Sequence, residues 1–354
     1  MNKKMKGLVI GRFQPVGLNH TEMLARVDEM GLEELVLGIG TTQSGFRNAK
    51  NPFSFDEIAE ILYPVASAMK TPVRIFKIPD LNDPPNYAEH VEKITGCDTE
   101  DYFVISGNRY TLDCFTEHGK NYRTISIPPQ VKLNQGYLCA SDIRDLILND
   151  GPWQQYVPES TKKVIEKYGI SKLKEILMLK PDEEMVYQGH VKLKRKLHDG
   201  KMWDVVQSKN ACAIMYIDPY DNVWFVKQYR VPVGKEVLEL PAETMDKPGK
   251  SSLEVITEGL EEECGIRISP EQIKYFTTIG SSEGHDSEYV DLYYASGPYN
   301  FVGQRLEESE NIQVVKIPFE KAYKMFQTGE LQGSKTVTLL QMEYIKRLEK
   351  SKDG

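Results

Sequence analysis

Five short apolar segments alternate with helix-like segments over the first 130 residues, and this order limits the folds open to the chain. The apolar segments are LVI at 8–10, ELVLGIG at 34–40, VRIFKI at 73–78, DYFVIS at 101–106 and YRTISI at 122–127. Between them, apolar residues recur at helical spacing in TEMLARVDEM, FDEIAEILYPVASAMK, NYAEHVEKI and TLDCFTEHG. Such alternation predicts an α/β fold with a doubly wound parallel sheet, in which ligands bind beyond the carboxyl ends of the strands.

The sequence pattern changes near residue 180, in the segment LKPDEEM. A helical, lysine-rich stretch from about Ser141 to Leu179 precedes this point. Beyond it, paired strands are predicted by the alternation in VYQGHVKLKRKL, MWDVVQS, ACAIMYID and VWFVKQYR, and a hairpin turn by PYDN at 219–222. Because 354 residues are also long for one hydrophobic core, we predict two domains, residues 1–180 and 181–354.

Composition excludes several classes of protein. The net charge of −8 argues against broad attraction to nucleic acid or to an anionic membrane, and the apolar runs are shorter than the ~20 residues of a membrane span. The five cysteines have no paired spacing, so we expect neither a disulfide framework nor a zinc site. The N-terminus leads directly into the first apolar segment, without room for a secretory leader. We expect a cytoplasmic protein; the sequence leaves open whether it is a homo-oligomer.

The segment GRFQPVGLNH, residues 11–20, follows the first predicted strand. A strand end that leads into a helix offers free backbone N–H groups and a positive dipole end, which favour phosphate. Gly11 would let the backbone approach a phosphate, Arg12 would add charge, and His20 would touch it from the first helical turn. Asn19 or Thr21 would cap the helix. The alternative is an ordinary capped turn with an incidental histidine.

Three further segments accompany this loop: NPFSFDE at 51–57, SGNRYTL at 106–112 and YLCASDIRDLILNDGPWQQYVP at 137–158. Together they resemble the archaeal-type nicotinamide mononucleotide adenylyltransferase family, over about residues 7–170. That family carries GRFQPxHxGH after its first strand and an (I/Y)S-x-T-x-(I/V)R motif at a late helix. The resemblance implies a Rossmann-like nucleotidyltransferase domain. Its activity would be transfer of AMP from ATP to nicotinamide mononucleotide, giving NAD and pyrophosphate, with Mg²⁺ or Mn²⁺ as cofactor.

The family's site residues carry over position by position. Those implied to bind ATP are Gly11, Arg12, Phe13, Gln14, His20, Ser141 and Arg144, of which His20 and Arg144 are also implied to be catalytic. Asn108 and Trp153 match residues implied to bind nicotinamide mononucleotide. The first histidine of the motif is absent, because Gly17 stands in its place, and Asn19 replaces the glycine. Loss of one charge-stabilising donor often costs about 10² to 10³ in rate, so nucleotide binding would survive more readily than turnover.

A second resemblance covers about residues 185–345. Residues 224–268, WFVKQYRVPVGKEVLELPAETMDKPGKSSLEVITEGLEEECGIRI, resemble the Nudix hydrolase signature, G-x5-E-x7-R-E-U-x-E-E-x-G-U, where U is aliphatic. The ADP-ribose pyrophosphatase branch also shows QYR-x-P and ELPAG ahead of it. The resemblance implies an α/β/α Nudix domain that hydrolyses ADP-ribose or a similar nucleoside diphosphate. It implies Glu262, Glu263 and Ala242 as metal ligands, and Glu262, Glu263 and Glu288 as catalytic residues.

This segment departs from the signature in its charged residues. Gly259 stands where the signature has its second glutamate, so a metal ligand is lost, and we expect the helix to tolerate its restoration by Gly259→Glu. Lys250 and Glu258 stand where the signature has glutamate and arginine, and we predict that these exchanged charges form an ion pair. Without the flanking segments, EGLEEE would indicate only a solvated acidic helix face. Because both sites lack a charged residue, the alternative function is a nucleotide-binding sensor or regulatory module of NAD metabolism.

Overall fold

The computed structural model describes residues 5–81, 83–116, 120–134, 136–189, 191–306 and 311–352. The chain divides into two compact units. The N-terminal unit comprises Met1–Gln188 and Lys194–Trp203, and the C-terminal unit comprises Gly189–Leu193 and Asp204–Gly354. The domain boundary expected at residue 180 stays a prediction.

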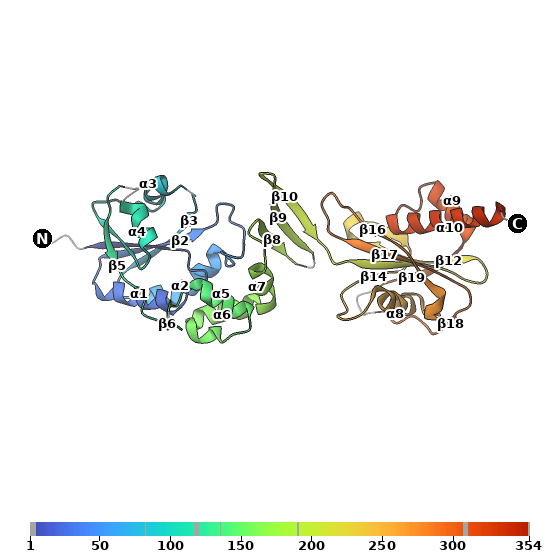
Figure 1. Cartoon of the computed structure of the whole chain (residues 1–354), viewed down its shortest axis with the longest axis horizontal. Helices are drawn as coiled ribbons and strands as arrows, with labels where there is room; N and C mark the ends of the chain where they lie inside the picture. Colours follow the sequence, from blue (N-terminus) through green and yellow to red (C-terminus); the bar gives the residue numbers. More distant parts are fainter. Residues whose placement is uncertain are drawn as a thin grey trace. The chain divides into compact units, whose positions relative to one another are not determined.

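A five-stranded parallel sheet forms the centre of the N-terminal unit (Figure 1). Its order is β3-β2-β1-β4-β5. The strands are β1 (Lys6–Gly11), β2 (Glu34–Thr41), β3 (Val73–Pro79), β4 (Tyr102–Ser106) and β5 (Arg123–Ser126). All five predicted strands are confirmed, and so is the Rossmann-like parallel sheet. Central β1 pairs with both β2 and β4, so the chain winds outward from it in both directions.

Helices cover both faces of this sheet. Successive side chains of a strand point to opposite sides, so both faces carry apolar side chains that must be covered. Val9, Leu35 and Leu37 pack in the cluster that includes α1 (Leu18–Glu29) and α2 (Phe55–Ala68). Leu8, Ile10 and Val36 pack in the cluster that includes α3 (Pro84–Thr95) and α4 (Arg109–Thr116). The predicted helices are therefore present, although the end of TLDCFTEHG, residues 117–119, lies outside the described residues.

The stretch predicted as helical from 141 to 179 is interrupted. It contains α5 (Ala140–Leu148), the 3-10 helix η1 (Trp153–Tyr156), α6 (Glu159–Tyr168) and α7 (Ile170–Leu177). Two short strands, β6 (Lys132–Leu133) and β7 (Gly136–Tyr137), precede α5. The breaks fall at residues 149–152, at Val157-Pro158 and at Gly169, whose φ of 96° suits glycine. Apolar spacing alone did not indicate them.

The segment VYQGHVKLKRKL contributes to two strands instead of one. These strands are β8 (Glu183–Gln188) and β9 (Lys192–His198), and with β10 (Lys201–Gln207) they make a three-stranded sheet. His190 lies outside the described residues.

The main sheet of the C-terminal unit has the order β13-β12-β11-β17-β16, with β14 paired to β11 and β19 paired to β12. Its strands are β11 (Ala211–Ile217), β12 (Asn222–Arg230), β13 (Lys235–Glu239), β14 (Ala242–Thr244), β16 (Ile273–Gly280), β17 (Tyr289–Ser296) and β19 (Gln313–Pro318). A separate pair consists of β15 (Ile266–Arg267) and β18 (Asn300–Phe301). The expected hairpin turn at 219–222 joins β11 to β12, where the side chain of Asp218 accepts hydrogen bonds from the N–H groups of Tyr220 and Asn222.

Helices also lie on both faces of this mixed sheet (Figure 1). Residues of α8 (Ser252–Cys264), including Val255 and Leu260, share a buried cluster with Ile214 and Trp224 of the sheet. On the other face, α9 (Phe319–Gln327) and α10 (Ser334–Lys352) pack against Ala213 and other residues of β11. The unit is thus layered as helix, sheet and helices.

The five cysteines are free thiols; Cys139 is exposed and Cys97, Cys114, Cys212 and Cys264 are buried. Over the described ranges, every helix is too short or too polar to cross a bilayer.

Candidate functional site

A cavity of about 750 Å³ opens in the N-terminal unit, lined by residues that end or follow several parallel strands. Its lining includes Gly11 at the end of β1, Thr41 at the end of β2, Asp80 after β3 and Ser106 at the end of β4. This is the sheet edge at which the fold was expected to bind a ligand. Of the residues implied by the first resemblance, the lining contains Gly11, Arg12, Phe13, His20 and Asn108.

His20 lies at the start of α1, with its ring against Phe13 and its side chain lining the cavity. Its Nδ1 accepts a hydrogen bond of 3.0 Å from the backbone N–H of Gly17, the residue that caps α1. Burial lowers the pKa of His20 to about 4. At neutral pH the ring is therefore uncharged, and its proton must sit on Nε2 because Nδ1 is accepting. His20 presents a neutral N–H donor to the cavity.

The expectation that Asn19 or Thr21 caps α1 was wrong. The Asn19 side chain instead bonds the segment that leads to α5. Its Nδ2 donates to the carbonyls of Val131 and Leu138, and its Oδ1 accepts from the N–H groups of Gln130 and Val131. Thr21 donates to the carbonyl of Leu18. The long-range partners of Asn19 could not be known from its local sequence, and its role is to hold one wall of the cavity.

Gln14 is buried and ties two of the recognised segments together. Its amide donates to the carbonyl of Phe53 at 3.0 Å and accepts from the N–H of Phe53 at 2.9 Å. Phe53 belongs to the segment NPFSFDE, so this pair of bonds fixes that segment against the opening loop. Gln14 is absent from the cavity lining as the described residues define it.

The two arginines of the motifs have different surroundings. Arg12 lines the cavity and forms an ion pair of 2.5 Å with Asp80. Arg144 donates to the carbonyl of Gln14 at 2.6 Å, and burial lowers its pKa. Among the residues that the structure describes, no carboxylate forms an ion pair with Arg144, so its charge is available to an anion.

The remaining implied residues are placed as follows. Asn108 lines the cavity, and its Oδ1 accepts from the N–H of Tyr110 at the start of α4. The Ser141 Oγ lies 2.9 Å from the Cys139 Sγ. Trp153 is only 7% exposed and packs in the core with Ile143 and Val157. The described lining of the cavity includes neither Ser141, Arg144 nor Trp153, so their ligand contacts stay predictions.

Sequence reasoning missed several lining residues, among them Thr41, Asp80, Asp83, Tyr87 and Tyr110. Thr41 and Asp80 could have been found, because each ends or directly follows a predicted parallel strand. Tyr87 and Asp83 lie at the start of α3, and no motif marked them.

In the C-terminal unit, Glu243 of β14 fills the space beside Gly259 of α8. A Cβ atom added to Gly259 would lie 2.2 Å from the Glu243 Cγ and 2.6 Å from its Cδ. A side chain at position 259 therefore requires the Glu243 side chain to move, and the tolerance of the helix for a glutamate there stays a prediction. Glu243 itself stands where the resembling ELPAG segment has glycine. The carboxylate beside position 259 thus comes from β14 and not from α8.

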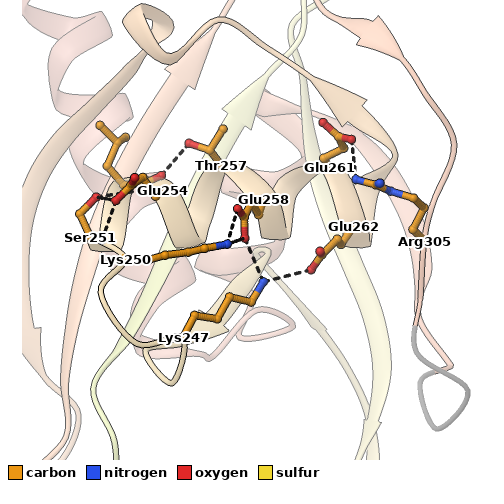
Figure 2. Close-up of polar contacts among 10 residues, drawn as sticks. Lys247, Lys250, Ser251, Glu254, Thr257, Glu258, Glu261, Glu262 and Arg305 are labelled. Carbon is orange, nitrogen blue, oxygen red and sulfur yellow. Dashed lines mark hydrogen bonds and ion pairs between the residues drawn. The ribbon is translucent and has the colours of Figure 1, made fainter.

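The predicted ion pair between Lys250 and Glu258 is confirmed, with Nζ 2.5 Å from Oε1 and 2.6 Å from Oε2 (Figure 2). A second lysine joins it. Lys247 Nζ lies 3.2 Å from a Glu258 oxygen and 3.5 Å from a Glu262 oxygen. These contacts, led by Lys250, lower the pKa of Glu258. An ammonium group thus occupies the carboxylate cluster in which the resemblance implies a metal.

The implied metal ligands are engaged within the protein. Glu263 is buried, and its carboxylate accepts from the N–H of Ala242 at 3.3 Å. Glu262 pairs with Lys247, and Glu288 lies at the end of the 281–288 loop, just before β17. Across the described ranges, no group of three or more His, Cys, Asp or Glu side chains is arranged to hold a metal ion.

Comparison with known proteins identifies the N-terminal half. The chain is 32% identical over 183 residues to the nicotinamide-nucleotide adenylyltransferase of Thermococcus sibiricus, which covers 51% of this chain and 92% of that protein. The chain belongs to this family. It is also 28% identical over 172 residues to the enzyme of the same name from Methanothrix thermoacetophila, and 27% identical over 192 residues to that from Pyrococcus abyssi. These matches cover 48% and 53% of this chain, and 95% and 98% of those proteins. No family model matches the chain.

The first prediction concerns the protonation of His20. Its pKa in the folded protein, about 4, is below the ordinary 6.5. This group therefore stabilises the fold fully above about pH 6.5 and loses that contribution as pH falls toward 4. The loss should be about 3 kcal/mol. NMR titration of the six histidines, with His20 assigned through His20→Asn, should place its midpoint near pH 4. A midpoint above pH 6 would contradict the donor role argued for this adenylyltransferase-family histidine.

The second prediction concerns Gly259 and Glu243. In the wild-type background, Gly259→Ala should be neutral or destabilising, because overpacking costs about 1–3 kcal/mol and offsets the helix gain of about 1 kcal/mol. In a Glu243→Ala background, the same change should stabilise by about 1 kcal/mol, since the atoms that block the Cβ are gone. Urea unfolding of the four proteins measures this reversal of sign. Strictly additive effects would show that the two side chains do not compete for space.

Proposed function

We propose that the N-terminal unit transfers AMP from ATP to nicotinamide mononucleotide, giving NAD and pyrophosphate. The observation that carries the proposal is the position of Gly11, Arg12 and His20 in the lining of a 750 Å³ cavity, at the carboxyl edge of a parallel sheet, in a chain of the nicotinamide-nucleotide adenylyltransferase family. The relatives' names state that activity for them.

In this reaction a 5′-phosphate oxygen of the mononucleotide attacks the α-phosphorus of ATP. The bond from that phosphorus to the bridging oxygen breaks, and pyrophosphate leaves. Little covalent chemistry falls to the protein, so positioning and stabilisation of charge supply most of the rate. His20 Nε2 donates to a phosphate oxygen, and the N-terminal ends of α1 and α5 face the same part of the cavity, through Gly17, Cys139 and Ala140.

Arg144 has two roles in this proposal. Its hydrogen bond to the Gln14 carbonyl holds the opening loop in place. The Gln14 side chain in turn bonds Phe53 and so connects the loop to the 51–57 segment. Its remaining N–H groups bind ATP phosphate. Mg²⁺ or Mn²⁺ would enter with the phosphates and neutralise their charge, since nucleotidyltransferases generally use a divalent metal and the described residues form no metal-binding group of their own.

For the C-terminal unit we propose a role as a nucleotide-binding module. It binds an ADP-ribose-like nucleoside diphosphate and hydrolyses it only slowly. The observation that favours this role over Nudix hydrolysis is Lys247, whose ammonium neutralises Glu258 and Glu262. A divalent cation would have to displace it, so the residues present do not fit the two or three metals that activate water in such a site.

Product analysis tests the proposal for the N-terminal unit. The purified full chain, incubated with ATP, nicotinamide mononucleotide and Mg²⁺, should release NAD and pyrophosphate in equal amounts. A rate 10²-fold or more below that of a two-histidine relative would fit the missing donor at Gly17. Complete absence of NAD, with both nucleotides bound, would support the sensor role instead.

Restoring the missing histidine extends this test, and the structure dictates how. Gly17 has a φ of −109°, so its backbone accepts a side chain, but a Cβ there would lie 2.6 Å from Ile143 Cδ1. Ile143→Val removes that atom. The double variant Gly17→His/Ile143→Val should therefore raise turnover and leave ATP affinity little changed, because the gain is for charge in the transition state. Ile143→Val alone is the matched control. Equal turnover in both variants would contradict the proposed loop geometry.

A further prediction tests the C-terminal unit. ADP-ribose should bind the full chain in calorimetry with similar affinity in Mg²⁺ and in EDTA, because Lys247 already neutralises the carboxylates. Release of AMP and ribose 5-phosphate should be slow. Cleavage that requires Mg²⁺ and disappears in Glu262→Gln would overturn this role and support Nudix hydrolysis.

A further inference from the structure

The strand β8 contacts the loop that follows β2, residues 42–50, within the N-terminal unit. The Met185 N–H donates to the Arg47 carbonyl at 2.8 Å, and the Arg47 N–H donates to the Met185 carbonyl at 3.4 Å. The Ser44 hydroxyl also donates to the Glu184 carboxylate at 2.7 Å. One strand thus holds the loop at two points, once through backbone groups and once through side chains.

Two arginines add to this contact. The guanidinium of Arg47 lies 4.6 Å from the centre of the Tyr168 ring. The guanidinium of Arg195, in β9, lies 5.6 Å from the centre of the Phe46 ring, and one of its nitrogens is 4.0 Å from a Glu184 oxygen. A guanidinium within about 6 Å of a ring centre is attracted to it. The position of the loop therefore depends on side chains of β8 and β9 as well as on its own sequence.

The same loop also borders the opening loop of the nucleotide site. Thr42, Gly45 and Phe46 line a small cavity of about 20 Å³, and Gln14 lines it too. That volume is the space of roughly one water, so the walls lie close together, and a displaced wall changes the surroundings of Gln14. The Gln14 carbonyl is the group that accepts a hydrogen bond from Arg144. A path of contacts thus leads from β8 to a residue proposed to bind ATP phosphate.

Glu184 lies beyond the first resemblance, which ends near residue 170, so no motif marked it. Among the described residues it is also absent from the lining of the 750 Å³ cavity. We propose that Glu184 is a positioning residue for ATP binding, which acts by holding the loop 42–50 through Ser44. This inference rests on the proposed adenylyl transfer. It extends the functional part of the N-terminal unit to a strand beyond residue 180.

Three variants of the full chain test the inference. Glu184→Ala removes the acceptor of the Ser44 hydroxyl, whereas Glu184→Gln keeps an acceptor oxygen at that position. Glu183→Ala is the matched control, because it removes the preceding carboxylate of the same strand, which pairs with Lys194 at 3.9 Å. The competing explanation is that Glu184 only stabilises β8.

The kinetic constants distinguish the two explanations. Glu184→Ala should raise KM for ATP roughly threefold or more and change kcat less than about twofold, because binding lost equally from the ground state and the transition state appears in KM alone. Glu184→Gln and Glu183→Ala should both keep KM for ATP within about twofold of the wild type.

Limited proteolysis reports on the loop itself, since Arg47 and Lys50 are the trypsin sites within residues 42–50. Cleavage at these sites should be roughly fivefold faster in Glu184→Ala, because loss of a hydrogen bond to a charged group raises the population of the opened loop. The control Glu183→Ala should be cleaved at the wild-type rate. An unchanged rate in Glu184→Ala overturns the inference.

Calorimetry with ATP separates the inference from the proposed reaction. Weaker ATP binding in Glu184→Ala, with Glu184→Gln near the wild type, supports the inference even if NAD formation is not observed. A lower Tm with unchanged ATP binding and KM overturns it and leaves the contact a structural one, while NAD formation by the wild type still supports the reaction. Equal weakening of ATP binding in Glu183→Ala also overturns it, because the effect then belongs to the strand as a whole.

Discussion

The hydrogen bond from the Gly17 N–H to His20 Nδ1 connects the fold of the N-terminal unit to its chemistry. It caps α1, and in doing so it fixes which ring nitrogen carries the proton. Burial of the same ring keeps it uncharged at neutral pH. Because the donor faces the cavity from a helix that packs on the sheet through Leu24 and Val27, the position of this N–H depends on the hydrophobic core rather than on a flexible loop.

Long-range bonds from the opening loop then build the rest of the site. Gln14 reaches Phe53, Asn19 reaches Val131 and Leu138, and Arg144 reaches back to the Gln14 carbonyl. Three segments far apart in sequence are held by polar side chains of one loop and one helix. The opening loop is therefore hydrogen-bonded to two of the segments that carry the family resemblance, 51–57 and 137–158.

Most of the N-terminal fold could be predicted from sequence, because strand–helix alternation leaves few arrangements and places Gly11 and His20 at the ligand-binding edge. The role of Asn19 could not, since its partners Gln130, Val131 and Leu138 are distant in sequence. In the C-terminal unit, the exchanged charges of Lys250 and Glu258 were readable because signature positions are paired. The contact of Lys247 with Glu262 could not be predicted, because Lys247 lies between signature positions. The path of the loop before α8 brings the two side chains together.

The contact between Glu243 and Gly259 also restricts the evolutionary routes open to this chain. The resembling segments have glycine at the strand position and glutamate at the helix position, and here the two residues are interchanged. Starting from either arrangement, one substitution alone gives two glutamates competing for a single space or two glycines and a lost carboxylate. Positions 243 and 259 are therefore expected to change together, because the space between β14 and α8 holds only one carboxylate side chain.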